Sequence, residues 1–183
     1  NPAWDYVLTC IPGTMDRLTA NPHHGLASID REGRRDAVAF HASAIQAVAR
    51  LNAHTGRKAV IAVQIHSAPR QRVRGEASGS AFRDSLEELA ALDWNGASLI
   101  VEHCDAFSEA HTPDKGFLSL EEEIDAIHSL GAPVGVTVNW ARSAIEGRSP
   151  HVPLAHVKLL REQGLLRGLM FSGVSASEGA YGV

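Results

Sequence analysis

Two residues that can move protons or bind metals stand at the ends of short apolar runs. Glu102 closes the run 99–101, and His66 ends an earlier run in the same way. A carboxylate in apolar surroundings is costly unless it meets a metal, a cation or hydrogen-bond donors. Glu102 is therefore a candidate catalytic base, substrate contact or metal ligand, although an ion pair with a loop arginine would also satisfy it. His66 could be a ligand, a proton carrier or a hydrogen-bonded wall residue.

Three further polar residues are candidate substrate contacts. Asn139 and Arg142 follow a later apolar run in the order Asn-Trp-Ala-Arg, and Ser172 begins a hydroxyl-rich segment, residues 172–177. If the segment that begins at Ser172 follows the seventh strand of a βα barrel, it lies where such barrels commonly hold phosphate. An arginine suits a carboxylate or a phosphate, or a pairing with Glu102. We therefore expect Asn139, Arg142 and Ser172 to bind substrate.

Two loop-like segments carry basic residues. His23 and His24 lie in a long segment after the first apolar run. Long loops in compact domains are often functional, so His24 is a candidate substrate contact, although an exposed histidine pair is more commonly solvated. Arg70, Arg72 and Arg74 alternate with other residues. They would hold an anion over the site or, in the interpretation we favour, form a mobile basic loop.

These residues are distributed over a repeating pattern of strands and helices. Five short apolar runs flanked by glycine or proline are typical of strands covered on both faces, at residues 5–10, 59–65, 98–104, 134–140 and 168–174. Amphipathic helical patterns lie between them at residues 34–53, 80–92, 119–130 and 153–163. The third helix begins with Ser-Leu-Glu-Glu, a capping box. The unit recurs about every 35 to 40 residues, which predicts consecutive parallel βαβ units.

Two α/β folds fit this pattern, and we favour the barrel. A doubly wound open sheet of five strands fits the size. A (β/α)8 TIM barrel needs about 250 residues, so residues 1–183 would form a single, partial barrel domain with five strands. No dinucleotide or P-loop motif follows the first strand, and polar residues stand at successive strand ends, where both folds bind ligands. Strand alternation sends His103 to the side opposite Glu102, under a helix, so we do not expect His103 to be a ligand.

Composition excludes several classes of protein. Hydrophobic residues make up 44% and charged residues 21% of the 183 positions, which excludes a disordered segment. The net charge of −4 argues against a nucleic-acid partner. No apolar run approaches the ~18 residues that cross a bilayer, and no signal peptide opens the chain, so we expect no membrane partner. Cys10 and Cys104 form neither a disulfide framework nor a CxxC pair, which favours the cytoplasm.

The order of the strand ends resembles the xylose-isomerase-like TIM-barrel superfamily, which includes sugar isomerases, sugar epimerases and endonuclease IV. More narrowly, the sequence resembles an uncharacterised bacterial domain-of-unknown-function family within it. The resemblance covers the whole chain and aligns its strands with strands three to seven of the barrel. Because strands one, two and eight would be missing, and Asn1 rather than a methionine begins the chain, we expect a fragment. Glu102 matches a metal-binding glutamate on strand five, and His66 resembles a histidine on strand four.

Other positions depart from the superfamily pattern. Epimerase-type members also bind the ion through an Asp on strand six, a His on strand seven and a Glu on strand eight. This chain has Asn139 and Arg142 in place of D-x-x-H, and Ser172 or Gly173 in place of the strand-seven histidine. The changes remove a negative charge and add a positive charge that cannot bind metal. The resemblance thus implies a divalent ion (Mn, Mg, Co or Zn) with Glu102 as the remaining ligand, in a site that has lost its usual set.

Two functions stay open. The first is a sugar or sugar-phosphate isomerase or epimerase that acts on a small polyhydroxylated substrate at the C-terminal face of the barrel, with Glu102 and His66 as catalytic residues. The second is a metal-free, catalytically altered barrel that binds a sugar or anionic metabolite without isomerising it. DNA repair is disfavoured by the acidic net charge. We expect a small-molecule substrate, and a homo-oligomer in which neighbouring chains complete the barrel stays open.

Overall fold

A parallel sheet of five strands forms the centre of the protein. The computed structural model describes residues 3–175 and residue 177. The strands are β1 Tyr6–Thr9, β2 Val60–Ile65, β3 Ser98–His103, β4 Gly135–Asn139 and β5 Leu166–Met170. The last strand is shifted toward the N-terminus from the predicted range 168–174, so Ser172 follows the strand instead of lying within it.

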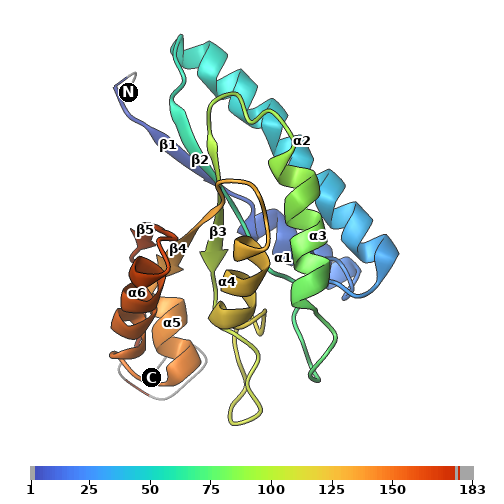
Figure 1. Ribbon diagram of the computed structural model, residues 1–183, viewed down its shortest axis with the longest axis vertical. Helices are drawn as coiled ribbons and strands as arrows, with labels where there is room; N and C mark the ends of the chain where they lie inside the picture. Colours follow the sequence, from blue (N-terminus) through green and yellow to red (C-terminus); the bar gives the residue numbers. More distant parts are fainter. Residues whose placement is uncertain (1–2, 176, 178–183) are drawn as a thin grey trace.

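The strand order identifies the sheet as part of a barrel. The strands lie in sequence order, β1-β2-β3-β4-β5, and each neighbouring pair is parallel. A doubly wound sheet would reverse its order at a switch point, and this sheet does not within the described residues. The sheet curls into a half-barrel with the helices on its outer side (Figure 1). This confirms the predicted α/β fold of consecutive parallel βα units.

Helices connect the strands in turn. Within residues 3–175 they are α1 Ile11–Ala20, α2 Arg31–Thr55, α3 Gly79–Ala90, α4 Leu120–His128, α5 Trp140–Gly147 and α6 Val152–Glu162. Four of them, α2, α3, α4 and α6, match the predicted helices. The capping box at the start of α4 is confirmed, because Ser119 accepts from the backbone N–H of Glu122 while the Glu122 carboxylate accepts from the N–H of Ser119.

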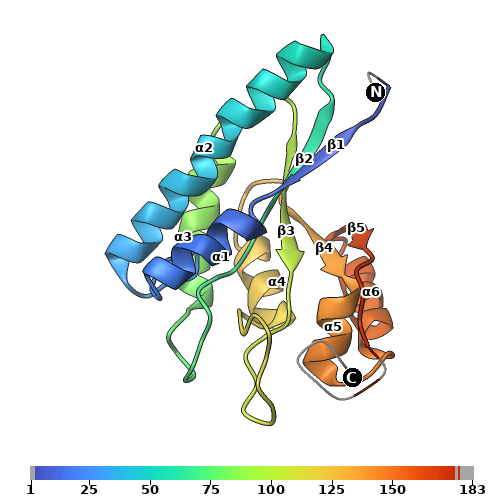
Figure 2. The same ribbon diagram turned by 180° about the vertical axis from the view of Figure 1, so that it is seen from behind.

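Two helices differ from the predictions, and both lie next to strand ends. The sequence predicts a loop after the first strand, but α1 begins there at once. Pro12 stands near its first position, where a missing N–H costs nothing. The strand predicted over 134–140 ends at Asn139, and α5 begins at the next residue because the Asn139 side chain caps it. Figure 2 shows that α1 begins where β1 ends and lies in front of α3 in this view.

The main hydrophobic core lies between the sheet and its covering helices. Val63 of β2 packs in one cluster with Phe82 and Leu86 of α3 and with Leu160 of α6, and all four are fully buried. Truncating such a side chain to alanine costs about 2–5 kcal/mol. A smaller cluster lies under α1, whose apolar side packs on Ala68, Cys104 and Phe117. The core thus holds the strand ends in place, and α1 covers part of them.

The outermost strands are partly exposed. β1 and β5 pair on one side only within the described sheet. Val7 on β1 is 49% exposed and Leu169 on β5 is 43% exposed. Because unpaired strand edges can pair with further strands, these two edges are where a sheet of this kind accepts additional strands.

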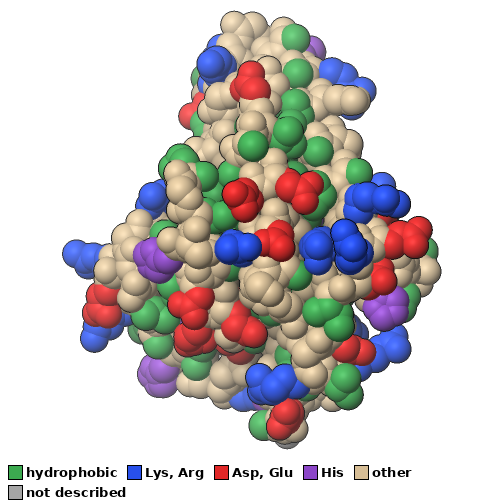
Figure 3. Space-filling view, turned by 45° about the vertical axis from the view of Figure 1, so that its right-hand side comes forward, with side chains coloured by type: hydrophobic (Ala, Val, Ile, Leu, Met, Phe, Trp, Pro, Cys, Tyr) green, Lys and Arg blue, Asp and Glu red, His purple; other side chains and the backbone are tan. Residues whose placement is uncertain are grey.

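The surface carries charges of both signs. Figure 3 shows Lys and Arg interspersed with Asp and Glu on one face of the molecule. Among the described helices, none combines the length and the apolar character that crossing a membrane requires.

Candidate functional site

A buried carboxylate stands where four neighbouring strands end. Glu102 on β3 is 3% exposed. His66, directly after β2, donates from Nε2 to Glu102 Oε2 at 3.0 Å, and Thr9, the last residue of β1, donates to the same oxygen at 3.3 Å. Asn139, the last residue of β4, donates from Nδ2 to Glu102 Oε1 at 2.9 Å. Parallel strands bring their carboxyl ends to one side of the barrel, which explains why residues so distant in sequence meet.

The orientation of the Asn139 amide follows from its other contacts. Its Oδ1 accepts from the backbone N–H of Arg142 at 3.3 Å and from the hydroxyl of Ser172 at 2.8 Å. A backbone N–H can only donate, so the atom facing it is the amide oxygen. The amide nitrogen therefore faces Glu102. The structure thus brings His66, Glu102, Asn139 and Ser172 into one connected group, as the sequence predicts.

The same contacts favour the ionised form of Glu102. Burial raises the pKa of this carboxyl. The hydrogen bond and charge of His66, with the hydrogen bonds from Asn139 and Thr9, outweigh burial and lower the pKa below its usual value. Glu102 is therefore a carboxylate at neutral pH, able to accept a proton or hold a cation.

A hollow of about 250 Å³ lies beside Glu102. We call it the mouth. Its lining consists of Thr9, Ile11, Pro12, Met15, Glu102, Cys104, Lys115, Asn139, Arg142 and Met170. The α1 residues form an apolar wall, Glu102 and Asn139 form a polar wall, and Lys115 and Arg142 bring two cationic side chains. Such a mixture suits a small ligand that carries hydroxyl groups and one negative charge.

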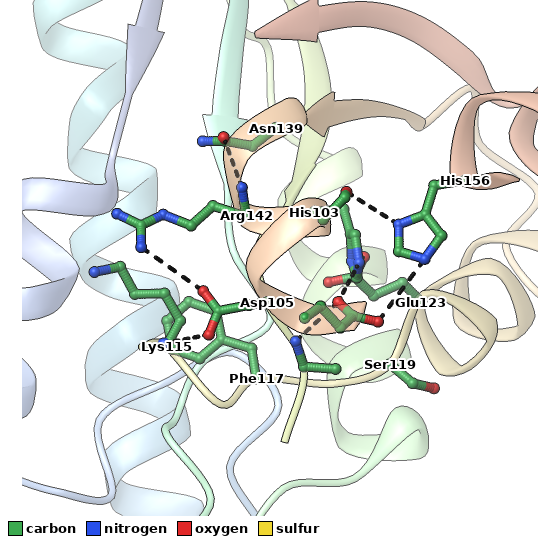
Figure 4. Close-up of polar contacts among 12 residues, drawn as sticks. His103, Asp105, Lys115, Phe117, Ser119, Glu123, Asn139, Arg142 and His156 are labelled. Atoms are coloured by element: carbon green, nitrogen blue, oxygen red, sulfur yellow. Dashed lines mark hydrogen bonds and ion pairs between the residues drawn. The ribbon is translucent and has the colours of Figure 1, made fainter. Parts of the chain in front are cut away.

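The two cations of the mouth are held by aspartates. Arg142 pairs with Asp114 and lies 3.9 Å from Asp105 Oδ1 (Figure 4), and Lys115 Nζ lies 2.8 Å from Asp114 Oδ2. Burial raises the pKa of Asp105, against the hydrogen bond from the Lys115 backbone N–H. The sequence leaves a pairing of Arg142 with Glu102 open. In the structure Arg142 pairs with Asp114, on the loop after β3.

His24 lies outside the mouth lining. Its side chain is fully buried and its Nδ1 contacts Asp36 Oδ2 of α2 at 2.8 Å. Burial lowers the pKa of His24 and outweighs the hydrogen bond and the charge of Asp36, which raise it. The solvated histidine pair envisaged from the sequence is wrong for His24, whereas His23 is exposed. The segment predicted as a loop contains α1, and the residues after α1 pack against α2, which buries His24.

The donor set of the mouth differs from the four-ligand set that the superfamily resemblance implies. His66, Glu102 and Cys104 offer ligand atoms within 4.8 Å of one another. Asn139, however, donates its amide N–H to Glu102, and its amide oxygen accepts the hydrogen bond that caps α5. Arg142 is a cation and cannot bind a metal ion. Within the described residues, the oxygen-rich set that a hard divalent ion prefers is therefore not assembled.

Three mouth residues with a hydroxyl, thiol or ammonium group were not assigned roles from the sequence. Thr9 and Cys104 lie in strand-like runs, where their side chains resemble ordinary core residues. Lys115 lies in the loop between β3 and α4, which has no periodic pattern. Only the folding of that loop, where the N–H of Lys115 donates to Asp105 Oδ2 at 2.7 Å, places the ammonium group beside the mouth.

His103 occupies the opposite face of β3, as strand alternation predicts. It is fully buried. Its Nδ1 lies 2.8 Å from Glu123 Oε2 of α4, and its Nε2 lies 3.0 Å from Glu146 Oε2 of α5. His156 of α6 lies nearby, and burial together with His103 lowers the pKa of His156 to about 4. Figure 4 shows His103, Glu123 and His156 apart from the Arg142 group.

Comparisons with known proteins agree with this architecture. The chain is 39% identical over 180 residues to the Uncharacterized protein STM3670 of Salmonella typhimurium (strain LT2), covering 98% of this chain and 56% of that protein. The chain thus spans a little over half the length of this curated relative. The crystal structure of a D-tagatose 3-epimerase-like protein is similar in fold, with a TM-score of 0.62 and 14% identity over 97% of this chain and 68% of that one. The model of the family named Domain of unknown function (DUF4862) matches residues 1–183, and the chain therefore belongs to that family.

Proposed function

We propose that the mouth binds a small polyhydroxylated carbonyl compound with an anionic group, and that Glu102 moves a proton on it, as in sugar isomerases and epimerases. The observation that carries the proposal is the ionised, buried Glu102, which three donors hold beside a hollow with two cationic side chains. The fold likeness to a D-tagatose 3-epimerase-like protein supports the same class of reaction.

The proposed step is a proton transfer next to a carbonyl. Glu102 accepts the proton of the C–H beside the carbonyl carbon, and the electron pair of that bond moves to form an enediolate on the carbonyl oxygen. Lys115, whose ammonium group lies at the mouth, stabilises the developing charge. Return of the proton to the former carbonyl carbon, with transfer of the neighbouring hydroxyl proton to the former carbonyl oxygen, gives isomerisation. Delivery of a solvent proton to the opposite face of the original carbon, with Glu102 releasing its proton to solvent, gives epimerisation.

The neighbours of Glu102 fit this role. Of the hydrogen bonds to Glu102 from Thr9, His66 and Asn139, the one from Thr9 is the longest, at 3.3 Å. A substrate can displace that bond at Oε2 while His66 and Asn139 keep the carboxylate in place. His66 also holds a ring proton next to the same oxygen and can pass it on.

Exchange of substrate hydrogen with solvent tests the proposal. The protein is incubated in D2O with a panel of pentoses, hexoses and their phosphates, and deuterium at the carbons next to the carbonyl is measured by NMR. We expect exchange with the wild type and at least a 100-fold loss in Glu102→Gln, in line with the size of general-base effects. Glu88→Gln, an exposed position on α3, is the matched control and keeps full activity. Wild-type exchange in Glu102→Gln on a substrate that the wild type converts refutes the proposal.

A binding protein without turnover is the second candidate. The observation in its favour is the Asn139 N–H on Glu102, which fills the place where the superfamily has a metal-binding carboxylate. Elemental analysis and calorimetry with the same panel separate the two candidates. Stoichiometric Mn, Mg, Co or Zn that disappears in Glu102→Gln, together with exchange, supports the enzyme. Binding without exchange supports the second candidate.

A further inference from the structure

We propose that His103, Glu146 and His156 form a zinc-binding site on the outer face of the sheet, separate from the mouth. The three residues come from β3, α5 and α6, and their candidate ligand atoms lie within 4.8 Å of one another. Two imidazoles with one carboxylate are a donor set that binds zinc in proteins and leaves a fourth position open.

The distances match a site that needs only a small closure. Glu146 Oε2 lies 3.0 Å from His103 Nε2, and Glu146 Oε1 lies 3.8 Å from His156 Nε2. In a tetrahedral zinc site with bonds of 2.0–2.1 Å, ligand atoms are about 3.3 Å apart. An ion between the two rings would replace the present contact between His103 and Glu146, while the Ala106 N–H, which donates to Glu146 Oε2 at 3.0 Å, keeps the carboxylate in position.

The second nitrogen of each ring already has a partner that directs the first toward the ion. His103 Nδ1 donates to Glu123 Oε2 at 2.8 Å, and Glu123 is itself held by the Ser67 hydroxyl. His156 Nδ1 lies 3.0 Å from the Ser143 hydroxyl oxygen. Metal-bound histidines are usually oriented in this way, by a carboxylate or another acceptor on the distal ring nitrogen. These contacts leave Nε2 of both rings facing Glu146.

Charge and access also fit a divalent ion. Glu123 and Glu146 bring two carboxylates to one neighbourhood, and a cation of charge +2 compensates both. Glu123 and His103 are fully buried, whereas the side chains of His156 and Glu146 are 12% and 20% exposed. The partly exposed side gives an entry path, and a water molecule would be the fourth ligand. The sequence does not lead us to expect His103 as a ligand, because strand alternation places it under a helix on the side opposite Glu102.

The inference is independent of the mouth, because Glu102 and His103 lie on opposite faces of β3. A zinc ion here would tie α5 and α6 to the sheet, near the strand end that carries Asn139. The expected consequence of zinc is therefore a more stable fold.

The test uses Co²⁺ as a spectroscopic probe for the metal alone. The purified protein is stripped with EDTA, dialysed and titrated with Co²⁺ in the Glu102→Gln background, which removes the candidate mouth ligand. We expect one equivalent to bind with a visible absorption band, Zn²⁺ to displace it, and Zn²⁺ to raise the Tm. His156→Gln should abolish the band, Ser143→Ala should weaken binding about 10-fold, and His128→Gln, an exposed histidine on α4, should leave it unchanged.

Several results would overturn the inference. They are a folded protein that binds no Co²⁺ and no Zn²⁺, and binding of equal strength in His156→Gln. If His156→Gln does not fold, Glu146→Gln takes its place: Co²⁺ binding as strong as in the wild-type titration would overturn the inference. Absence of binding would identify His103 as an imidazole held between two carboxylates for structural reasons alone.

Discussion

The two faces of β3 carry the same kinds of group in different surroundings. On the mouth side, Glu102 meets one imidazole, that of His66, and neutral donors. On the outer side, His103 meets two carboxylates, those of Glu123 and Glu146. A single carboxylate held by such donors can accept a proton from a ligand, which makes the carboxyl group neutral and transfers the negative charge to the ligand. Two carboxylates around one imidazole have an excess of negative charge, which suits a bound cation.

Removing the imidazole on each side of β3 should give the largest difference in the free energy of unfolding. We expect His103→Leu to lower the free energy of unfolding by about 3–5 kcal/mol, because Glu123 is left buried without its charged partner. His66→Leu should cost about 1–3 kcal/mol, because Asn139 and Thr9 still donate to Glu102. Urea denaturation followed by circular dichroism, with EDTA present, measures both. Equal losses would remove the distinction between the two faces.

Acid should act through His41, a buried histidine of α2 that lies near His66. Burial, the main cause, lowers the pKa of His41 to about 3, against the hydrogen bond to the Ala37 carbonyl. The unfolded chain therefore binds a proton at pH values where the folded protein does not, and stability falls as the pH drops from about 6.5 toward 3. His41→Leu should reduce the loss between pH 7 and pH 5 by about 2 kcal/mol. Unfolding curves at both pH values, with His54→Leu as an exposed control on the same helix, check this.

Restoring a carboxylate in the mouth should make the two faces more alike. Asn139→Asp keeps a side chain that can cap α5 but places a second negative charge beside Glu102. We expect a loss of about 1.4 kcal/mol without metal, which corresponds to a shift of one pKa unit, and recovery on addition of Mn²⁺. Tm measurements with and without Mn²⁺ provide the readout. An unchanged Tm in both conditions would mean that Asn139 does not control the charge of the mouth.

A smaller effect is expected at a position that belongs to neither face. Ser119→Ala removes the capping box of α4 and should cost about 1 kcal/mol. Both Co²⁺ binding and hydrogen exchange should stay at wild-type levels, as judged by the titration and NMR assays above. A loss of either would show that helix stability alone can mimic the effects assigned to the two sites.

The sequence predicts the parts of the molecule that depend on local pattern. The strands, four of the helices and the capping box at Ser119 follow from apolar periodicity and from residues close in sequence. The meeting of Glu102, Asn139 and Ser172 follows as well, because parallel strands end at one side of a sheet.

Features that depend on distant partners could not be predicted. The burial of His24 requires α1, and Pro12 and Gly13 in that segment read as turn residues. The contact of Arg142 with Asp114 joins α5 to the loop after β3, and no local pattern relates these two segments. The same holds for Glu146 and His156, which reach His103 only after α5 and α6 pack on the sheet.

The helix α1 gives the mouth a wall that is built differently from the rest. Ile11 and Met15 supply thioether and aliphatic surface, while the charged and hydrogen-bonding groups come from strand ends, from the loop after β3 and from α5. Methionine adapts readily to neighbours of different shape. Substitutions along this helix therefore change which ligands fit the mouth, while Glu102 and its hydrogen-bond donors stay the same.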